Sequence, residues 1–160
     1  MHKHLLIAVL AAGIAAAGCG GPAARPIVNE GVWGQASTGD VFDACVRVLH
    51  TRGYFSQAVS RDAGVISTDW QTFPVKELGE GVRGRYKMNI LIYTGEGKKT
   101  TLSINIRGAW DAPAQAEVTA RRIEPYINNR AGSDVKELFD DIGKIVGAPA
   151  FTSTFKLSVE

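Results

Sequence analysis

Two segments in the middle of the chain carry an apolar residue at every second position. In RYKMNILI (85–92) the apolar side chains are Tyr86, Met88, Ile90 and Ile92, and in TLSINIR (101–107) they are Leu102, Ile104 and Ile106. A period of two places alternate side chains on opposite faces of a strand, so each segment predicts a β-strand with one buried face. The turn sequence TGEGKK (94–99) between them indicates an antiparallel hairpin.

The numbering of the apolar residues restricts how this hairpin can pair. These residues are even-numbered in both strands, so the numbers of directly opposite residues must add to an even number. The loop must therefore contain an odd number of residues, as in a three-residue loop with a glycine bulge. Gly95 and Gly97 have the backbone freedom that such a loop requires.

Two amphipathic helices are predicted, one before and one after the strands. The first begins after Ser37, with a capping-box-like spacing to Asp40, and extends to about Arg52. The second has Ser133 as its expected N-cap and ends at Gly147. The apolar stripe of the first helix contains Val41, Cys45, Val48 and Leu49, and that of the second contains Val135, Leu138, Phe139, Ile142, Ile145 and Val146.

The remaining segments are less regular. We expect strands over residues 54–60 and 65–70, joined by a turn at 61–64. The second of these strands would place Ile66, Thr68 and Trp70 on one face, and residues 71–82 would be irregular. Residues 110–132 fit either a fifth strand that ends near Pro125 or an irregular crossover, and we expect the strand.

The predicted fold is a single α+β domain with the element order α-β-β-β-β-(β)-α. Its sheet is an antiparallel meander of four or five strands. Two amphipathic helices cover one face in a helix-grip-like arrangement, because an apolar sheet face must be buried. The other face is expected to be exposed to solvent.

The first 18 residues are typical of a secretory signal peptide. Lys3 precedes an apolar run from Leu5 to Ala17, and small residues follow as far as Cys19. A membrane span needs about 20 apolar residues, whereas Leu5 to Cys19 is only 15 residues long and contains many Ala and Gly. The segment therefore predicts export and cleavage rather than a transmembrane helix.

Two cleavage patterns are present. Ala15-Ala16-Ala17 is an A-x-A site that would release a soluble periplasmic protein, in which Cys19 and Cys45 are available for a disulfide. Ala16-Ala17-Gly18-Cys19 instead resembles the bacterial lipobox, in which the cysteine is acylated, although Ala16 stands where Leu is usual.

The segments around the two cysteines favour the lipoprotein. The Gly/Pro/Ala-rich stretch after Cys19 suits a flexible tether, and Cys45 fits the apolar stripe of a helix as a small buried residue. We therefore expect a lipoprotein signal peptide at 1–18, an acylated Cys19 with its tether at 19–36, and the α+β domain at 37–160.

Composition and motifs contain no catalytic or metal-binding pattern. The 160 residues are 45% hydrophobic and 21% charged with a net charge of +2, as in ordinary globular proteins and unlike strongly basic nucleic-acid binders. GEGVRG (79–84) matches G-x-G-x-x-G, but an alternating strand follows it where a dinucleotide site needs a helix N-terminus. After the leader His50 is the only histidine, and no Cys/His pair has zinc spacing. We expect no enzyme activity, cofactor, metal site or nucleic-acid partner.

The domain resembles the BamC family, accessory lipoproteins of the machinery that assembles outer-membrane β-barrels. The similarity lies in GYF (53–55), DAGVISTDW (62–70) and the strand from Arg83 to Tyr93, within residues 38–147. Members of that family carry two such domains and a long N-terminal segment, whereas this chain has room for one domain and a short tether. The resemblance implies a helix-grip-like domain in an envelope lipoprotein, with outer-membrane assembly proteins as partners.

Basic residues are concentrated in the hairpin and the segment after it. Residues 83–122 contain eight basic and three acidic residues. Such charges either keep a wet sheet face soluble and discourage edge pairing, or form a surface for anionic lipid head groups, lipopolysaccharide or an acidic partner. Trp70 and Trp110 are candidate aromatic anchors or core residues. The candidate anion-binding residues are Arg83, Arg85, Lys87 and Arg107 on one strand face, together with Arg121 and Arg122.

The sequence thus predicts an envelope lipoprotein that acts without catalysis as a scaffold or interaction module. Acyl chains on Cys19 would hold it in the outer membrane, facing the periplasm. The alternative is a periplasmic-side protein that binds an anionic lipid head group or glycan through its basic sheet face. No sequence feature indicates the oligomeric state.

Overall fold

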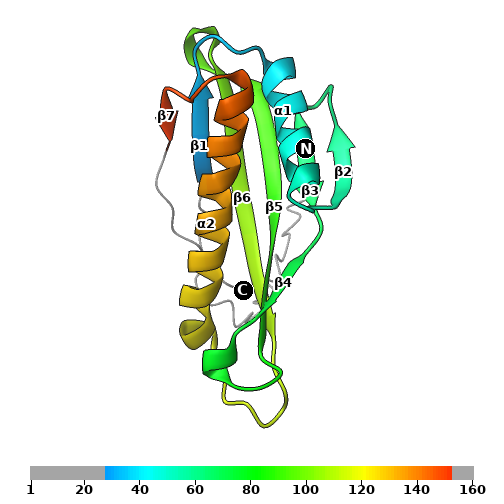
Figure 1. Ribbon diagram of the computed structural model, residues 1–160, viewed down its shortest axis with the longest axis vertical. Helices are drawn as coiled ribbons and strands as arrows, with labels where there is room; N and C mark the ends of the chain where they lie inside the picture. Colours follow the sequence, from blue (N-terminus) through cyan, green and yellow to red (C-terminus); the bar gives the residue numbers. More distant parts are fainter. Residues whose placement is uncertain (1–27, 153–160) are drawn as a thin grey trace, which may run out of the picture.

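The computed structural model describes residues 28–152, which form an antiparallel sheet with two helices on one of its faces (Figure 1). Neighbouring strands lie in the order β2-β3-β5-β6-β1-β7, and β4 pairs with β5 further along the edge that β3 occupies. In chain order the elements are β1 (Val28–Trp33), α1 (Thr38–Thr51), β2 (Ser56–Ser60), β3 (Val65–Thr68), β4 (Gln71–Pro74), the 3-10 helix η1 (Lys76–Leu78), β5 (Arg83–Thr94), the 3-10 helix η2 (Glu96–Lys98), β6 (Thr100–Asp111), α2 (Ala120–Val146) and β7 (Phe151–Thr152).

The predicted α+β class, with two helices on one face of an antiparallel sheet, is confirmed. The sheet has seven strands, more than the four or five expected, because β1, β4 and β7 were not predicted. The possible fifth strand is not formed, since no strand lies between Asp111 and α2. Within residues 28–152, neither helix is long and apolar enough to span a bilayer.

The hairpin of β5 and β6 is the centre of the sheet and runs along most of its height (Figure 1). Ile90 lies opposite Ile104 and Met88 opposite Ile106, so even-numbered residues face one another as the pattern requires. The loop between Thr94 and Thr100 contains five residues, which is an odd number but longer than the three-residue example. The even-numbered apolar side chains from Tyr86 to Ile106 are buried beneath the helices.

Helix α1 begins as its capping sequence predicts. The Ser37 hydroxyl accepts a hydrogen bond from the Asp40 backbone N–H at 3.1 Å, and Gly53 follows the helix with a φ of 77°. Cys45 is buried on the apolar stripe, and burial raises the pKa of its thiol to about 12. Arg52 joins the two helices through ion pairs with Glu137 at 2.6 Å and Asp141 at 2.5 Å.

Helix α2 begins at Ala120, so the expected strand near 110–125 and the expected N-cap at Ser133 are both wrong. Pro125 is the sixth residue of the helix and lies beyond the first turn that tolerates proline, so its missing N–H removes one intrahelical hydrogen bond. The added turns extend the apolar stripe with Ile123 and Ile127, and both side chains are fully buried. Burial of this longer stripe outweighs the local cost of the proline.

Two strands replace chain that was expected to be irregular. β1 lies within the predicted tether at 19–36, pairs with β6, and buries Trp33, whose Nε1 donates to the Gly147 carbonyl at 2.7 Å. β4 lies within 71–82 and pairs with β5. The folded domain therefore includes residues 28–36, while the predicted signal peptide at 1–18 and Cys19 lie outside the described residues.

Candidate functional site

The four basic residues predicted to share a strand face lie together on the sheet face that α1 and α2 leave uncovered. We call this face the open face, and we call Arg83, Arg85, Lys87 and Arg107 the basic cluster. Lys87 lies directly opposite Arg107, and Arg85 and Arg83 follow on the same strand. The alternation that buries Tyr86 and Met88 under the helices directs these side chains to the other side.

Trp70 completes the basic cluster. Its ring centroid lies 5.1 Å from the Arg85 guanidinium carbon and 5.2 Å from the Lys87 Nζ, so both cations contact the indole. The expectation that Trp70 shares a face with Ile66 and Thr68 is wrong, because the pairing with β5 shifts by one residue between β3 and β4, and this shift moves Trp70 to the other face.

The charges of the basic cluster are only partly balanced. The Arg85 Nη2 lies 3.6 Å from the Asp111 Oδ1, and both side chains are partly exposed. The Arg85 Nε is buried and has no hydrogen-bond partner among the described residues. Lys87 and Arg107 are like charges placed directly opposite each other, an arrangement that destabilises a sheet.

Arg121 and Arg122 do not join the basic cluster. Both are exposed in the first turn of α2, in the helical layer, and the Arg122 Nη1 donates to the Glu117 carbonyl at 2.7 Å. Trp110 also lies elsewhere: it is opposite Gly84 on the helix-covered face and packs half-buried against the core. The six predicted residues thus divide into four that share the open face and two that do not.

Beyond the basic cluster the open face becomes neutral and then apolar. Ser67 donates a hydrogen bond to the Asn89 side-chain oxygen at 2.8 Å, in the middle of the sheet. Val65, Leu91 and Tyr93, which we call the apolar end, lie next and are 36%, 43% and 39% exposed. This group was not predicted from the sequence. The one local signal of it is Leu91, an apolar residue at a position that the alternation of the strand makes polar.

A second polar group lies between α2 and the sheet, beside a cavity of about 290 Å³. The Tyr54 and Tyr86 hydroxyl oxygens are 2.9 Å apart, Tyr86 donates to the Asp134 carboxylate, and the Arg130 Nε lies 3.2 Å from the same oxygen. Burial raises the pKa of Tyr54 to about 12, against the opposing effect of the hydrogen bond to Tyr86. Burial, followed by the Asp134 hydrogen bond, raises the pKa of Tyr86 as well. Sequence reasoning missed this group because Tyr86 was counted among the apolar residues of its strand, so no role was considered for its hydroxyl.

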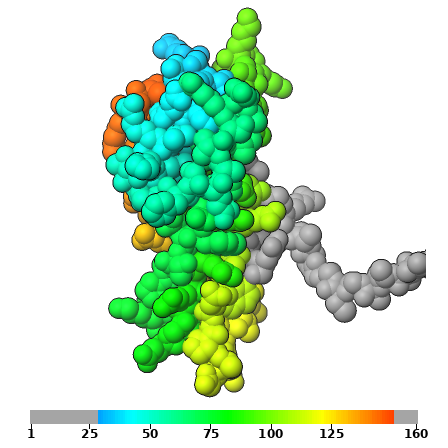
Figure 2. All heavy atoms as spheres, turned by 90° about the vertical axis from the view of Figure 1, so that its right-hand side faces the viewer, coloured from blue at the N-terminus to red at the C-terminus, as the bar shows by residue number. Residues whose placement is uncertain are grey.

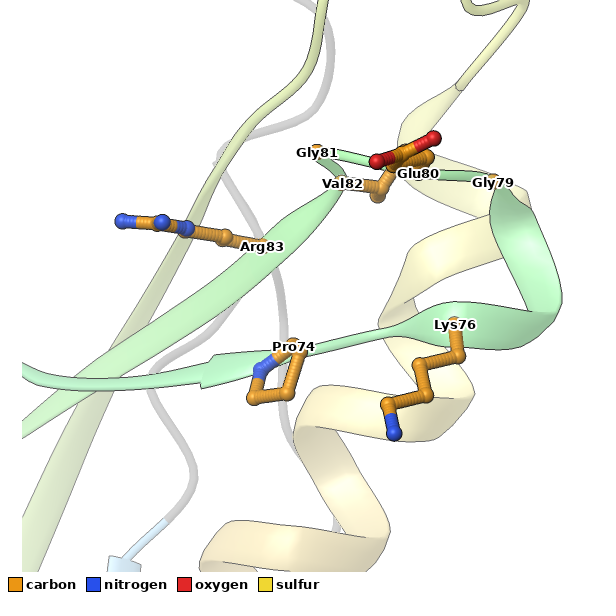
Figure 3. Close-up of a pocket in the computed structure, with 7 residues that line it drawn as sticks. All are labelled: Pro74, Lys76, Gly79, Glu80, Gly81, Val82 and Arg83. Carbon is orange, nitrogen blue, oxygen red and sulfur yellow. The ribbon is translucent and has the colours of Figure 1, made fainter.

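The GEGVRG loop borders a cavity of about 570 Å³ between β4 and β5 (Figure 3). The side chains of Lys76, Glu80 and Arg83 point in different directions in this view, so they do not converge on a common point. The loop leads into β5, as predicted, and therefore provides no helix N-terminus for a pyrophosphate. Within residues 28–152 no group of three or more His, Cys, Asp or Glu side chains is placed to hold a metal ion.

Comparisons with known proteins find a similar backbone fold in a solved structure and no similar sequence. No protein-family model and no curated protein matches the sequence. Among solved structures, the crystal structure of a DUF4468 family protein from Bacteroides ovatus is similar, with a TM-score of 0.45 and 12% sequence identity over 78% of this chain and 88% of that chain. At this identity the similarity carries no information on function.

Proposed function

We propose that this chain is a non-catalytic envelope lipoprotein whose α+β domain binds anionic groups through its open face. Acyl chains on Cys19 would hold it in the outer membrane on the periplasmic side, as the leader and lipobox-like sequence suggest. The supporting observation is the basic cluster around Trp70.

The arrangement of the cluster favours binding over solubility alone. Solubility is served by charges of both signs spread over a surface, whereas Lys87 and Arg107 are like charges held directly opposite each other. An anion placed between them would remove this repulsion. Guanidinium and ammonium groups donate charge-assisted hydrogen bonds to phosphate and carboxylate, and Lys87 and Arg107 provide one of each at directly opposite positions.

A titration with tripolyphosphate tests this proposal. The full-length, natively processed protein is titrated by calorimetry and compared with a Lys87→Gln/Arg107→Gln variant. An Arg121→Gln/Arg122→Gln variant is the matched control, because it removes the same charge from the helical layer. We expect the first variant to lose binding and the control to retain it. Equal loss in both variants, or no binding by the unmodified protein, would refute the proposal.

A protein-interaction module is the second candidate, and the edge strand β2 favours it. All five of its residues are exposed, and among the described strands it pairs only with β3, on the side of the molecule that faces the viewer in Figure 2. Phe55 beside it is 74% exposed. An edge strand presents unpaired backbone groups to which a partner strand can add. By the resemblance to the BamC family, the partners would be outer-membrane assembly proteins.

Crosslinking of the natively processed protein in envelopes tests this second candidate. We expect barrel-assembly proteins to be captured by the acylated chain and by the Lys87→Gln/Arg107→Gln variant, but not by Phe55→Ser. A Cys19→Ala variant shows whether capture needs the anchor, and mass spectrometry of the bait shows whether Cys19 is acylated. An acylated bait that captures no such protein would exclude the scaffold role and leave the anion-binding proposal standing.

A further inference from the structure

We infer that the anionic groups bound by the open face are phosphate head groups of the membrane that holds Cys19, so that the domain lies with its open face on the bilayer. This inference rests on the proposed function and names the source of the anion. Three observations on the described residues support it: the point at which the chain enters the sheet, the charge of the face, and the apolar residues that share it.

The chain enters the sheet beside the basic cluster. Val28, where the described chain begins, lies opposite Asn105 on β6, and Arg107 is the next residue of β6 on the same face. Cys19 precedes Val28 by nine residues, a length of chain that spans at most about 32 Å. An acylated Cys19 would therefore keep the basic cluster within a short distance of the head groups.

The charge of the open face suits an anionic bilayer. The described strands place four cations on this face, together with Asp111 beside Arg85 and Glu30 opposite Ser103. Near an anionic membrane each Lys or Arg strengthens binding about fivefold. Because a tether makes the second contact intramolecular, such weak contacts are sufficient to orient the domain.

The apolar end adds exposed apolar side chains to the cations of the open face, and a protein surface that lies on a membrane needs both. Val65, Leu91 and Tyr93 hold three of the exposed large apolar side chains in the described part of the chain. Leu91 follows Lys87 by four residues on β5, or about 13 Å along the strand. Surfaces that lie on membranes combine cations with exposed apolar groups, and tyrosine is enriched at the head-group level.

Contact quenching in vesicles tests this orientation. The acylated, processed chain is reconstituted into vesicles of phosphatidylcholine with or without phosphatidylglycerol, containing a lipid with a nitroxide head group. A bimane label is placed at Thr72→Cys, opposite Arg85 on the open face, or at Asn129→Cys, exposed on α2. The native Cys45 is buried and does not compete for the label.

We expect strong quenching at position 72 and little at position 129 in vesicles that contain phosphatidylglycerol. Without phosphatidylglycerol, quenching at 72 should fall to the level at 129. The Lys87→Gln/Arg107→Gln variant should lower the docking equilibrium constant about 25-fold, at about fivefold per cation. The Arg121→Gln/Arg122→Gln control should leave it unchanged.

Equal quenching at the two positions in anionic vesicles, or stronger quenching at position 129, would overturn the inference. If the same protein still binds tripolyphosphate through Lys87 and Arg107, the anion-binding function stands and its ligand is a soluble phosphate. If it binds neither, both proposals fail. The two experiments therefore separate failure of the membrane orientation from failure of the proposed function.

Discussion

The buried hydroxyl chain between α2 and the sheet allows a sharp test of how the two layers are held together. Tyr86 donates its hydroxyl hydrogen to Asp134, which is 9% exposed, so the Tyr54 hydroxyl must be the donor in the bond between the two tyrosines. Tyr86 is thus the middle of the chain and Tyr54 its outer end. Removing one hydroxyl or the other should have unequal effects.

Tyr54→Phe removes only the outer donor, and Tyr86 keeps its bond to Asp134. We expect a loss of about 1 kcal/mol in the free energy of unfolding, the net contribution of one ordinary hydrogen bond. Tyr86→Phe removes a bond to a charged acceptor and also leaves the Tyr54 hydroxyl without its partner. We expect this variant to lose about 3 kcal/mol.

The double variant distinguishes a chain from two independent bonds. When Phe replaces both tyrosines, no Tyr54 hydroxyl remains to be left unpaired, so the loss should not exceed that of Tyr86→Phe alone. Urea unfolding of the full-length variants, followed by far-UV circular dichroism, measures these free energies if the slope of the transition is unchanged. Additive losses, or a Tyr54→Phe loss as large as that of Tyr86→Phe, would refute this account of the chain.

Two further predictions concern titration and packing. Burial raises the pKa of Tyr54 to about 12 from an ordinary value of 10.0, so the folded protein keeps a proton that the unfolded chain loses, and stability should fall between about pH 10 and pH 12. Urea unfolding across this range, in a Cys45→Ala background that removes the buried thiol, should show a smaller fall for Tyr54→Phe. Tyr86, whose pKa is also raised by burial, adds to the fall in both proteins, and an equal fall in the two would contradict the assignment to Tyr54. A Cβ on Gly31 would lie 2.6 Å from the Phe139 Cε1, so Gly31→Ala should lower the free energy of unfolding by about 1–3 kcal/mol. The control Gly34→Ala should leave it unchanged, because a Cβ on Gly34 would have nothing within 4 Å. Equal melting temperatures for the two variants would place β1 outside the packed core.

The central hairpin and the first helix could be predicted because their signals are local. The alternation over 85–92 and 101–107 needs no knowledge of the rest of the chain, and it determines which residues face the core. The capping of α1 by Ser37 is likewise contained in four residues. In both cases local preference and tertiary packing favour the same structure.

β1 could not be predicted because two of its three buried positions are not apolar in sequence. Asn29 and Gly31 face the helices together with Trp33. The Asn29 side chain is buried with its Nδ2 3.5 Å from the Ile104 carbonyl, and the ring of Phe139 occupies the space beside Gly31 where a Cβ would be. Because a polar residue and a glycine occupy these positions, the sequence shows no alternation between apolar and polar residues here. The burial of Asn29 and Gly31 depends on contacts with β6 and α2, which the local sequence does not indicate.

β4 was missed for a related reason. Phe73 lies opposite Gly84, and its ring packs where a side chain on that glycine would otherwise stand. β4 contains Pro74, and the part of β5 with which it pairs contains Gly84 among basic residues. Neither segment by itself predicts that the two will pair. The start of α2 was misplaced because Pro125 suggested the end of a strand, whereas Ile123 and Ile127 fill the core on either side of it.

The basic cluster was predictable and its surroundings were not. The positions of Arg85, Lys87 and Arg107 follow from the same parity that buries the even-numbered residues. Trp70 joins them only because the pairing with β5 shifts by one residue between β3 and β4, a shift that no local signal in the sequence marks. Arg121 and Arg122 were grouped with them by nearness in sequence, but the longer α2 places these two in the helical layer.

The division of the sheet into two faces also predicts how stability and binding should separate at the basic cluster. The core depends on the even-numbered side chains, whereas Lys87 is only partly buried and Arg107 is exposed, and their direct opposition costs stability. Lys87→Gln/Arg107→Gln should therefore raise the free energy of unfolding by up to about 1 kcal/mol while it lowers anion binding. Urea unfolding measured beside the tripolyphosphate titration compares the two effects in one variant. If the cluster serves binding, the variant should gain stability and lose affinity for tripolyphosphate. A loss of stability in this variant would show that the cations support the fold instead.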